Sequence, residues 1–422
     1  MHTLKQILAM IIPAPLLGQM FSVYHFALSW FAAIFYGHPS QSLLVIAVTG
    51  TKGKTSVTEM LNAIFEKSGQ RTCLINSIRF KIGDASRPNM TRMSMPGRFF
   101  TQKFLHDALD AECTTAILEV TSEGARQYRH RFLDFDALIF TNLAPEHIES
   151  HGSYSAYADA KFEIGKQLAR SKKRPRIIVG NADDKESGRY LTLPIEHALP
   201  FSLSACLPIS ANENGGQFTF DNTSISLQLP GEFSLKNALA SATMARALGI
   251  STQIIAEALN GIERIPGRAE KIDAGQNFLV VVDYAHTPDS LTALYEAYKK
   301  VRKICVFGSM GGGRDAWKRP IMGRIADEHC AEIILTDEDS CDEDPLQIVN
   351  DIAHGMSRKP SIIMDRRAAI QNALQLARRG DAVLVTGKGT DPSIYGTHGT
   401  KQPWSDADVA REEIAKILKI KL

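Results

Sequence analysis

The stretch Val48-Thr-Gly-Thr-Lys-Gly-Lys-Thr-Ser-Val57 decides the fold that the sequence predicts. It follows the apolar run Leu43–Val48, which is typical of a buried strand in a parallel sheet. It leads into Ser56–Lys67, where apolar residues recur at helical spacing. A strand, a glycine-rich turn and a helix in this order predict a phosphate-binding loop. The alternative is a tight turn that contains these residues by chance, and it would leave the agreement of strand, turn and helix unexplained.

The polar residues of this loop have expected contacts with a phosphate group and with Mg²⁺. Gly50 and Gly53 let backbone N–H groups approach a phosphate, and the helix N-terminus adds its positive end. Lys54 would reach the terminal phosphates, and Thr55 would place its hydroxyl on Mg²⁺. The loop is shorter than the common pattern G-x-x-x-x-G-K-[ST], so it is a variant of that motif.

The bulk composition describes an ordinary globular chain. With 422 residues we expect two or three domains, and a net charge of +2 with no basic, aromatic-rich face argues against nucleic acid as a partner. The six cysteines are scattered without a C-x-x-C pair, so we expect reduced thiols of a cytosolic protein.

The N-terminal segment is strongly apolar over Ile7–Leu17 and Phe21–Tyr36. Four residues are expected to break these runs: Pro13, Pro15, Gly18 and Gln19. Neither run reaches the roughly 20 residues of a membrane span, and no cleavage site suggests a signal peptide. Two interpretations stay open. One is a packing of one or two helices on the next domain, and the other is an anchor lying at a membrane surface, with Trp30, Phe31 and Tyr36 at the headgroups.

Apolar strands alternate with helical patterns through the rest of the chain. The expected strands after the first are Ala116–Val120, Ala137–Thr141, Arg176–Gly180, Leu279–Val282, Lys303–Phe307, Glu332–Leu335 and Ala382–Val385. The expected helices include Leu235–Leu248, Asp289–Val301 and Ala368–Ala377, and a hairpin is expected around Asp221-Asn222. The fold class is therefore α/β. We predict a central, P-loop ATPase-like, mostly parallel sheet with flanking helices, and a C-terminal Rossmann-like α/β domain, over residues 43–264 and 265–422 after an apolar segment 1–42.

Polar residues follow the central strands at the edge where open α/β sheets bind ligands. Glu119 ends one strand and could hold Mg²⁺, although a carboxylate there is often merely solvated. The next strand leads into Glu146, His147, Glu149 and His151. Two histidines with carboxylates at one sheet edge favour a functional site, and no nearby cysteine supports zinc. In the C-terminal part, glycine-rich and charged stretches follow strands in the same way, at Asp283–Pro288, Gly308–Asp315 and Gly387–Asp391.

These motifs together make the chain similar to the Mur ligase family, the ATP-dependent amide-bond ligases of bacterial cell-wall precursor synthesis. Within the family it most resembles the ligases that add the third peptide residue. The resemblance runs from about Val45 to the C-terminus. Its motifs are V-T-G-T-K-G-K-T, E-V-T-S, T-N-L-x-x-E-H-I-E-x-H-G, Y-A-D-A-K, G-E-F-S-L-K-N, P-G-R-A-E, V-D-Y-A-H-T-P-D, G-G-R-D-x-x-K-R and G-K-G.

The resemblance implies an ATP-dependent ligase that adds an amino acid, expected to be a diamino acid, to a muramyl-dipeptide-type precursor. The reaction would pass through an acyl phosphate and release ADP and phosphate. The implied cofactors are ATP and Mg²⁺, with a carbamylated lysine at Lys161. We expect a monomeric cytoplasmic enzyme that touches the inner face of the membrane through residues 1–40.

The family's functional residues map onto this sequence as follows. The implied catalytic residues are Lys54, Lys161 and His147, and the implied metal ligands are Thr55, Glu119, His147 and Lys161. The implied ATP contacts are Gly50, Thr51, Lys52, Gly53, Lys54, Thr55, Asn142, Asn237, Arg268 and Asp283. The acyl substrate is expected at Ser94, Pro96, Thr121 and Ser122, and the amino acid at Arg314, Asp339, Cys341, Gly387 and Asp391.

The chain departs from the family pattern at two places that bear on its substrates. The family implies a larger uridine-binding N-terminal domain, whereas residues 1–42 are apolar, so the carrier could be UDP or a lipid. The family's D-N-P-R motif, whose arginine binds the distal carboxylate of diaminopimelate, is here Glu338-Asp-Ser-Cys341 in an acidic run. We therefore expect L-lysine or L-ornithine over diaminopimelate, unless Arg314, Lys318 or Arg366 supplies the carboxylate contact.

Two other classes of function stay open on the sequence. Folylpolyglutamate synthase and polyglutamate or cyanophycin synthesis share the ATP-binding core but lack the full set of C-terminal motifs. A non-enzymatic ATP-binding scaffold would need broken metal ligands, whereas Glu119, His147 and Lys161 are all present.

Overall fold

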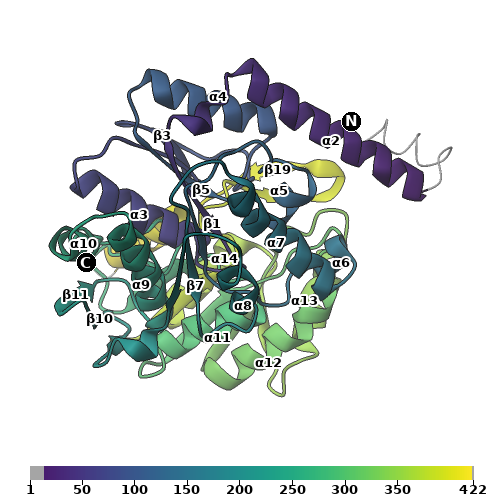
Figure 1. Ribbon diagram of the computed structural model, residues 1–422. Coiled ribbons are helices and arrows are strands. Elements are labelled where there is room, and N and C mark those ends of the chain that lie inside the picture. Colours follow the sequence, from purple (N-terminus) through teal and green to yellow (C-terminus); the bar gives the residue numbers. More distant parts are fainter. Residues whose placement is uncertain (1–13, 421–422) are drawn as a thin grey trace.

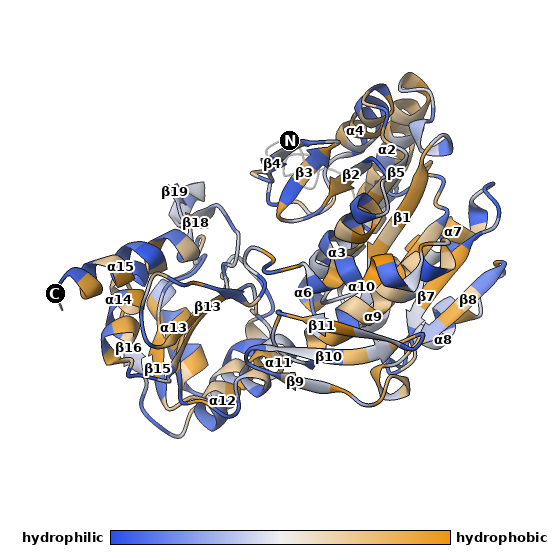
Figure 2. Cartoon of the chain, turned by 90° about the vertical axis from the view of Figure 1, so that its left-hand side faces the viewer, coloured by the Kyte–Doolittle hydropathy of each residue, from blue (hydrophilic) through white to orange (hydrophobic). Residues whose placement is uncertain are grey.

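The computed structural model describes residues 14–420. The chain builds two α/β parts, which lie side by side in Figure 2, each with hydrophobic strands enclosed by helices. The first part follows an N-terminal helix, α2 (Ala14–Phe35), which lies along α4 (Arg98–Asp110) in Figure 1.

The first part is built on an eight-stranded sheet with the order β4-β3-β2-β5-β1-β6-β7-β8. Its strands are β1 (Leu44–Thr49), β2 (Thr72–Ile75), β3 (Arg79–Ile82), β4 (Ala85–Pro88), β5 (Thr115–Glu119), β6 (Ala137–Phe140), β7 (Ile177–Asn181) and β8 (His197–Phe201). From β2 to β8 all neighbouring strands are parallel, and only β3 and β4 add antiparallel pairs at one edge. The carboxyl ends of β1, β5 and β6 therefore meet at one edge of the sheet.

Helices cover both faces of this sheet, which explains why its strands are apolar throughout. Along β1, Ile46 and Val48 belong to one hydrophobic cluster, and Val45 and Ala47 belong to the other. The first face packs against α3 (Lys54–Lys67), α9 (Glu232–Ala247) and α10 (Thr252–Asn260). The second face packs against α4, α5 (Ser122–Arg126), α7 (Tyr154–Arg170) and α8 (Ser187–Leu191), and α6 (Ile148–His151) precedes α7.

The second part holds a six-stranded sheet with the order β12-β13-β17-β14-β15-β16. Its strands are β12 (Glu270–Lys271), β13 (Leu279–Asp283), β14 (Lys303–Phe307), β15 (Glu332–Leu335), β16 (Ser361–Ile362) and β17 (Ala382–Thr386), and only β12 is antiparallel. On one face lie α11 (Pro288–Ala297), α12 (Arg319–His329) and α13 (Pro345–Ala353), and on the other lie α14 (Arg366–Leu376) and α15 (Asp406–Ile420). Two small sheets remain: β9 (Ser210–Asn212), β10 (Gly215–Phe220) and β11 (Thr223–Leu227), and β18 (Ser393–Tyr395) with β19 (Lys401–Pro403).

The predicted α/β fold class is confirmed, and so is the hairpin, in which β10 and β11 pair across Asp221-Asn222. The predicted strands match the observed ones within one or two residues. Four strands of this sheet were not predicted: β2, β3, β4 and β8, which are short and lie at or toward the sheet edges. The division into domains at 264 and 265 stays a prediction.

The expectation that Pro15, Gly18 and Gln19 break the N-terminal apolar segment is wrong, because α2 includes all three residues. A single glycine inside a helix costs only about 1 kcal/mol relative to alanine. Packing offsets that cost, since Ser29, Ala32 and Ala33 of α2 are buried. The first apolar run, Ile7–Leu17, lies mostly outside the described residues.

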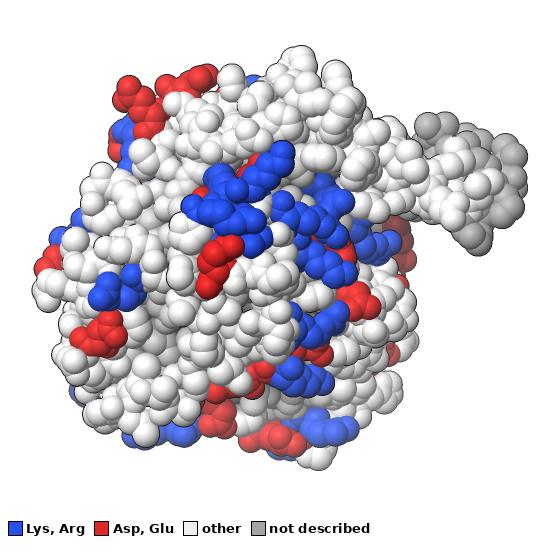
Figure 3. Space-filling model, in the orientation of Figure 1, with Lys and Arg blue, Asp and Glu red and all other residues white. Residues whose placement is uncertain are grey.

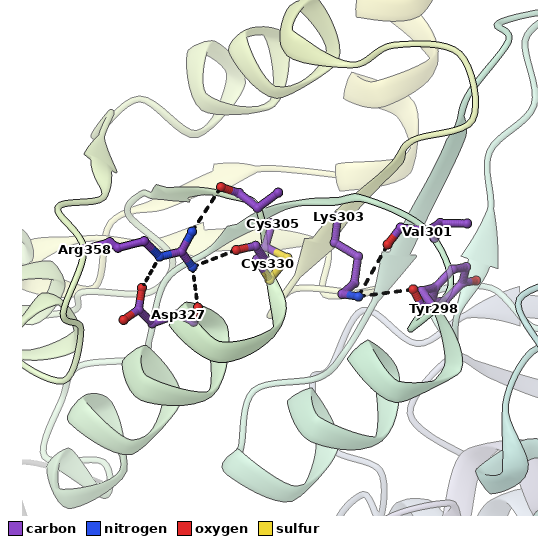
Figure 4. The surroundings of a disulfide bond; sticks show 8 residues. Tyr298, Val301, Lys303, Cys305, Asp327, Cys330 and Arg358 are labelled. Atoms are coloured by element: carbon purple, nitrogen blue, oxygen red, sulfur yellow. Dashed lines mark hydrogen bonds and ion pairs between the residues drawn. A yellow bond between two sulfur atoms is a disulfide. The ribbon is translucent and has the colours of Figure 1, made fainter.

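The expectation of six reduced thiols is also wrong, because Cys305 and Cys330 form a disulfide (Figure 4). The bond ties β14 to the residue after α12, where parallel pairing of β14 with β15 brings the two Cα atoms to 6.1 Å. Nearby, Arg358 donates to the Cys330 carbonyl at 2.8 Å and pairs with Asp327 at 2.7 Å. The remaining four cysteines are free: Cys73, Cys113, Cys206 and Cys341. The spacing of the bonded pair fits no sequence motif, so only the fold identifies it.

Candidate active site

The predicted phosphate loop connects β1 to α3, and its glycines are required by their surroundings. Gly50 and Gly53 have φ values of +146° and +83°, which other residues rarely adopt. A Cβ atom on Gly50 would lie 1.9 Å from the Thr141 hydroxyl oxygen, and one on Gly53 would lie 2.3 Å from Oδ1 of Asn237. Gly53 is also the N-cap of α3, so the loop presents the N-terminus of that helix.

The segment after β6 holds this loop in place. The backbone N–H of Lys52 donates to Oδ1 of Asn142 at 2.9 Å, and the Thr141 hydroxyl donates to the Lys52 carbonyl at 2.6 Å. The backbone N–H of Thr51 donates to the Asn142 carbonyl at 2.8 Å. Asn142, predicted as an ATP contact, therefore holds the loop in place, because its side chain accepts a hydrogen bond from the loop backbone.

Thr55 and Glu119 meet at the carboxyl ends of β1 and β5. The Thr55 hydroxyl donates to Oε2 of Glu119 at 2.8 Å, and the ammonium of Lys54 lies 3.9 Å from Oε1. A hydroxyl and a carboxylate beside a phosphate loop are the hard oxygen ligands that Mg²⁺ takes together with substrate phosphates. The residues present therefore fit Mg²⁺. Among residues 14–420, no three His, Cys, Asp or Glu side chains form a ready-made metal site, so phosphate or further groups would complete it.

Residues of the second α/β part reach this loop directly. The Arg268 guanidinium donates to the hydroxyl of Thr55 at 3.3 Å and to that of Ser77 at 2.8 Å, and it stacks on the Tyr284 ring at 4.7 Å. Asp283, predicted to contact the nucleotide, accepts from the backbone N–H groups of Ala269 and Ala285 at 2.6 Å each. Asp283 thus fixes the segment that carries Arg268, and burial raises its pKa.

Lys161 extends from α7 toward the phosphate loop and is only 2% exposed. Its ammonium donates to the Gly50 carbonyl at 2.6 Å and lies 5.1 Å from the centre of the Tyr157 ring. Burial, together with the Lys54 cation, holds the pKa of Lys161 well below its usual value. An isolated helix pattern would place this lysine in solvent, whereas the fold buries it at the site. An amine with a lowered pKa can add CO₂ to form a carbamate.

The predicted cluster after β6 is brought together by contacts from the second part. His147 has a left-handed φ of 57°, and its backbone N–H donates to Oδ2 of Asp315 at 2.6 Å. Burial lowers the pKa of His147 to about 4, so its imidazole is neutral and able to bind a metal. Asp315 was not predicted as a contact of His147, although it lies in the G-G-R-D motif.

Glu146 links three segments of the site. It accepts from Lys52 at 3.3 Å and lies 2.8 Å from Nε2 of His286. Burial alone would raise the pKa of Glu146, but Lys52 and His286 outweigh it and hold that pKa well below its usual range. Lys52, predicted to contact ATP, is therefore paired with a carboxylate.

The residues predicted for the acyl substrate lie on two adjoining segments. Thr121 is the N-cap of α5 and accepts from the backbone N–H of Gly124 at 3.1 Å, and Ser122 is buried beside it. A Cβ atom on Gly124 would lie 2.6 Å from the sulfur of Met95, the residue between Ser94 and Pro96. The two predicted stretches are therefore neighbours.

The residues predicted for the amino acid surround Asp339, which is 1% exposed. Asp339 accepts from Lys388 at 2.8 Å, from the Tyr395 backbone N–H at 2.9 Å and from Arg92 at 2.5 Å. Arg92 also pairs with Asp391 at 2.9 Å. Arg92 was not predicted for this region, since it lies 247 residues from Asp339 along the chain.

The other predicted members of this region take different positions. A Cβ atom on Gly387 would lie 2.2 Å from the carboxylate of Glu338, whose pKa burial raises to about 7. Cys341 donates its backbone N–H to the Tyr395 carbonyl at 3.0 Å, and Arg314 is exposed. Arg366 is buried and bound to Asp406 at 2.8 Å, so it cannot turn to a substrate carboxylate.

The acidic run that was expected to attract a substrate ammonium is largely engaged within the protein. Glu343 pairs with Arg319 at 2.7 Å, Asp342 accepts from the His398 backbone N–H at 2.7 Å, and Asp344 caps α13. This removes the main support for a preference for L-lysine or L-ornithine, which stays untested.

Comparisons with known proteins show the family of this chain. The model of the Mur ligase middle domain matches residues 48–245, and that of the Mur ligase glutamate ligase domain matches residues 267–389. A UDP-N-acetylmuramoyl-L-alanyl-D-glutamate–2,6-diaminopimelate ligase of Syntrophomonas wolfei is 36% identical over 382 residues, which cover 86% of this chain and 76% of that protein. A UDP-N-acetylmuramyl-tripeptide synthetase of Roseiflexus sp. is 36% identical over 421 residues, which cover 93% and 82%.

A solved structure points to the same family. A UDP-N-acetylmuramoyl-L-alanyl-D-glutamate–2,6-diaminopimelate ligase superposes with a TM-score of 0.60 at 27% identity, over 89% of this chain and 79% of that one. Both α/β parts of the present structure contribute residues to the candidate site. The chain therefore belongs to the Mur ligase family of ATP-dependent ligases.

Proposed function

We propose that this protein joins a diamino acid to the free carboxyl group of a muramyl-dipeptide precursor, at the expense of ATP. The observation that carries the proposal is the contact of Arg268 with Thr55 and Ser77, because it places the second α/β part over the phosphate loop. The relatives' names supply the substrate class. We propose that the enzyme acts as a monomer.

We propose a reaction in two steps, as expected for this family of ligases. An oxygen of the acceptor carboxylate attacks the γ-phosphorus of ATP, the bond to ADP breaks, and an acyl phosphate forms. The amine then attacks the acyl carbon, and phosphate leaves with the former carboxylate oxygen while the amine loses a proton. Lys54 offsets charge on the transferring phosphoryl group, and the helix N-terminus at Gly53 binds phosphate. Mg²⁺, held by Thr55 and Glu119, would supply further charge compensation.

Lys161 is proposed to act as a carbamate. Its position behind the loop, beside the Gly50 carbonyl and close to Lys54, is where an anion would compensate nearby cations. Addition of CO₂ to the neutral amine forms one N–C bond and releases a proton, which turns the side chain into an anion. That anion and His147 would then hold a second Mg²⁺.

The carrier and the amino acid follow the relatives' names. We propose a UDP-linked acceptor, with a lipid-linked acceptor as the alternative that the apolar N-terminal segment raises. We propose diaminopimelate as the amino acid, because the acidic run is engaged within the protein and a cation from another segment stands beside Cys341.

A panel of acceptors tests the proposed function. Purified protein with ATP, Mg²⁺ and meso-diaminopimelate is given UDP-linked muramyl dipeptide, lipid-linked muramyl dipeptide, a folate or no acceptor, and ADP is measured. We expect ADP release only with a muramyl dipeptide. ADP release that depends on the folate, or on no acceptor, would refute the assignment.

The helix α2 supports a contact with the membrane surface. It contains no Asp, Glu, Lys or Arg, and Figure 3 shows it as an uncharged ridge that emerges from the body of the protein. One face is buried against the protein, while large apolar side chains are exposed on the other: Leu16, Met20, Val23, Tyr24, Trp30, Phe31, Ile34 and Phe35. Among the described residues, no helix is long and apolar enough to cross a membrane.

We propose that this exposed face lies on an anionic phospholipid bilayer. Two cations lie against the same helix, since Arg98 contacts Nδ1 of His25 at 2.9 Å and Arg131 stacks on the Phe26 ring at 5.7 Å. Cations beside an apolar helix face favour anionic headgroups. In the sequence, the apolar run that begins at Ile7 leads into this helix.

Vesicle sedimentation tests this contact. We expect the full chain to sediment with vesicles that contain phosphatidylglycerol, and the variants Val23→Glu and Ile34→Glu to stay in the supernatant. Each buried side chain of this size contributes roughly 1.5–3 kcal/mol, so each charge should weaken binding by about tenfold or more. The matched control is Leu207→Glu, which alters an equally exposed apolar side chain elsewhere. Wild-type protein that stays in the supernatant in the presence of these vesicles would overturn the proposal.

A further inference from the structure

We propose that Arg92, a residue of the central α/β part, recognises the distal carboxylate of the incoming diamino acid and so determines which amino acid is joined. The inference rests on the proposed function and deepens it. Its structural basis is a guanidinium that crosses from the loop between β4 and α4 into the pocket around Asp339 and Asp391.

The contacts of Arg92 define the pocket. Its Nη2 atom lies 2.5 Å from Oδ2 of Asp339 and 2.9 Å from Oδ2 of Asp391, and its guanidinium stacks 4.1 Å from the centre of the Tyr395 ring. Both ion pairs use the same nitrogen. A guanidinium carries five N–H donors, so those on Nε and Nη1 remain for an acceptor other than these two carboxylates.

The loop that carries Arg92 is held in one conformation. Arg92 has a left-handed φ of 55°, which few residues other than glycine adopt. Asn89, which is 3% exposed, donates to the carbonyls of Asn76 at 2.7 Å and Met93 at 3.0 Å, and it accepts from the Thr91 hydroxyl at 2.6 Å. The side chain is therefore positioned before any substrate arrives.

The charges of the pocket match a zwitterion better than a lone cation. The two carboxylates of Asp339 and Asp391 are balanced by two cations, Lys388 and Arg92. A lysine side chain would bring one more positive charge to a balanced site. The distal end of diaminopimelate carries an ammonium and a carboxylate together, so the ammonium can approach the partly exposed Asp391 while the carboxylate accepts from Arg92.

Three buried cations near the pocket are each paired with a carboxylate of the protein. Arg319 is 3% exposed and pairs with Glu343 and Asp351, and Lys388 is fully buried beneath Asp339. Arg366 is bound to Asp406. Of these, only Arg92 combines partial exposure, at 19% of its side chain, with contact to both carboxylates.

Competition between two amino acids tests the assignment. The full-length wild type and the variants Arg92→Gln, Arg92→Lys and Arg87→Gln are each given meso-diaminopimelate and L-lysine, and kcat/KM is measured for both. Arg87 is the matched control, because it lies on the neighbouring strand β4 and its guanidinium stacks on Phe80, away from the pocket. L-lysine is the matched substrate, since it lacks only the distal carboxylate.

We expect the wild type and Arg87→Gln to favour diaminopimelate. Arg92→Gln should lose on the order of 100-fold in kcat/KM for diaminopimelate and far less for L-lysine, with the KM for ATP unchanged, because an unpaired carboxylate is costly to bury. Arg92→Lys should recover part of the loss. A wild type that favours L-lysine, or an Arg92→Gln variant that loses both substrates equally, would overturn the inference. A wild type that joins neither amino acid would refute the proposed function itself.

Discussion

Replacing Lys54 with alanine is expected to abolish ligation while leaving the protein folded. The side chain is 14% exposed and lies 3.9 Å from Glu119 at the mouth of the phosphate loop, where it would meet the terminal phosphates. Removing one such preorganised charge from a reacting group lowers the rate by roughly 10²–10³-fold, and loss of phosphate binding adds to this. The fold should persist, because the loop is held by backbone contacts with Thr141 and Asn142 that do not involve the Lys54 side chain.

The measurement is ligation rate together with thermal unfolding. The matched control is Lys67→Ala, which removes the same charge from the other end of α3, where the lysine is 51% exposed and pairs with Glu257. We expect near-normal rates for Lys67→Ala. A folded Lys54→Ala protein with a ligation rate close to that of the wild type would show that this loop does not bind the transferring phosphate.

Replacing Lys161 with alanine is expected to remove nearly all activity as well. If Lys161 carries a carbamate, its loss takes an anion from the metal site, and stripping CO₂ from the wild type should lower the rate reversibly, with recovery on adding bicarbonate. The control is Lys166→Ala on the same helix, since Lys166 is 43% exposed and pairs with Glu163. A small carboxylic acid added to Lys161→Ala should restore part of the rate by replacing the missing charge.

The CO₂ dependence of the wild type keeps this prediction testable even if the variant is unstable. Lys161 donates to the Gly50 carbonyl from a buried position, so its removal could disturb the loop by leaving that acceptor unpaired. Full activity of Lys161→Ala, or a wild-type ligation rate that does not change when CO₂ is removed, would show that Lys161 does not act as a carbamate.

Local patterns were sufficient for much of the fold and for the phosphate loop. The run before Gly50 is apolar on both faces because helices cover both sides of β1, and that pattern is visible in the sequence. Thr55 and Glu119 could be placed together because parallel strands end at one sheet edge. The burial of Lys161, by contrast, depends on how α7 packs, and its helix pattern alone suggested a solvated residue.

Contacts between distant segments could not be predicted. Arg92 contacts Asp339 and Asp391 only because the two α/β parts lie against each other. No periodicity in the sequence indicates which residues of the two parts come into contact. The same holds for Asp315, which accepts the backbone N–H of His147 across 168 residues. The acidic run near Cys341 suggested free carboxylates, whereas local pairing with Arg319 and with backbone N–H groups engages several of them.

The path of the phosphate is the central claim, and an oxygen label follows it directly. The acceptor is prepared with ¹⁸O in its free carboxyl group, and the wild-type protein is given ATP, Mg²⁺ and diaminopimelate. The account predicts ADP together with inorganic phosphate that carries a single ¹⁸O atom from the acceptor, seen by mass spectrometry, because the acyl phosphate passes that oxygen to phosphorus. Unlabelled phosphate, or AMP and pyrophosphate in place of ADP, would contradict it.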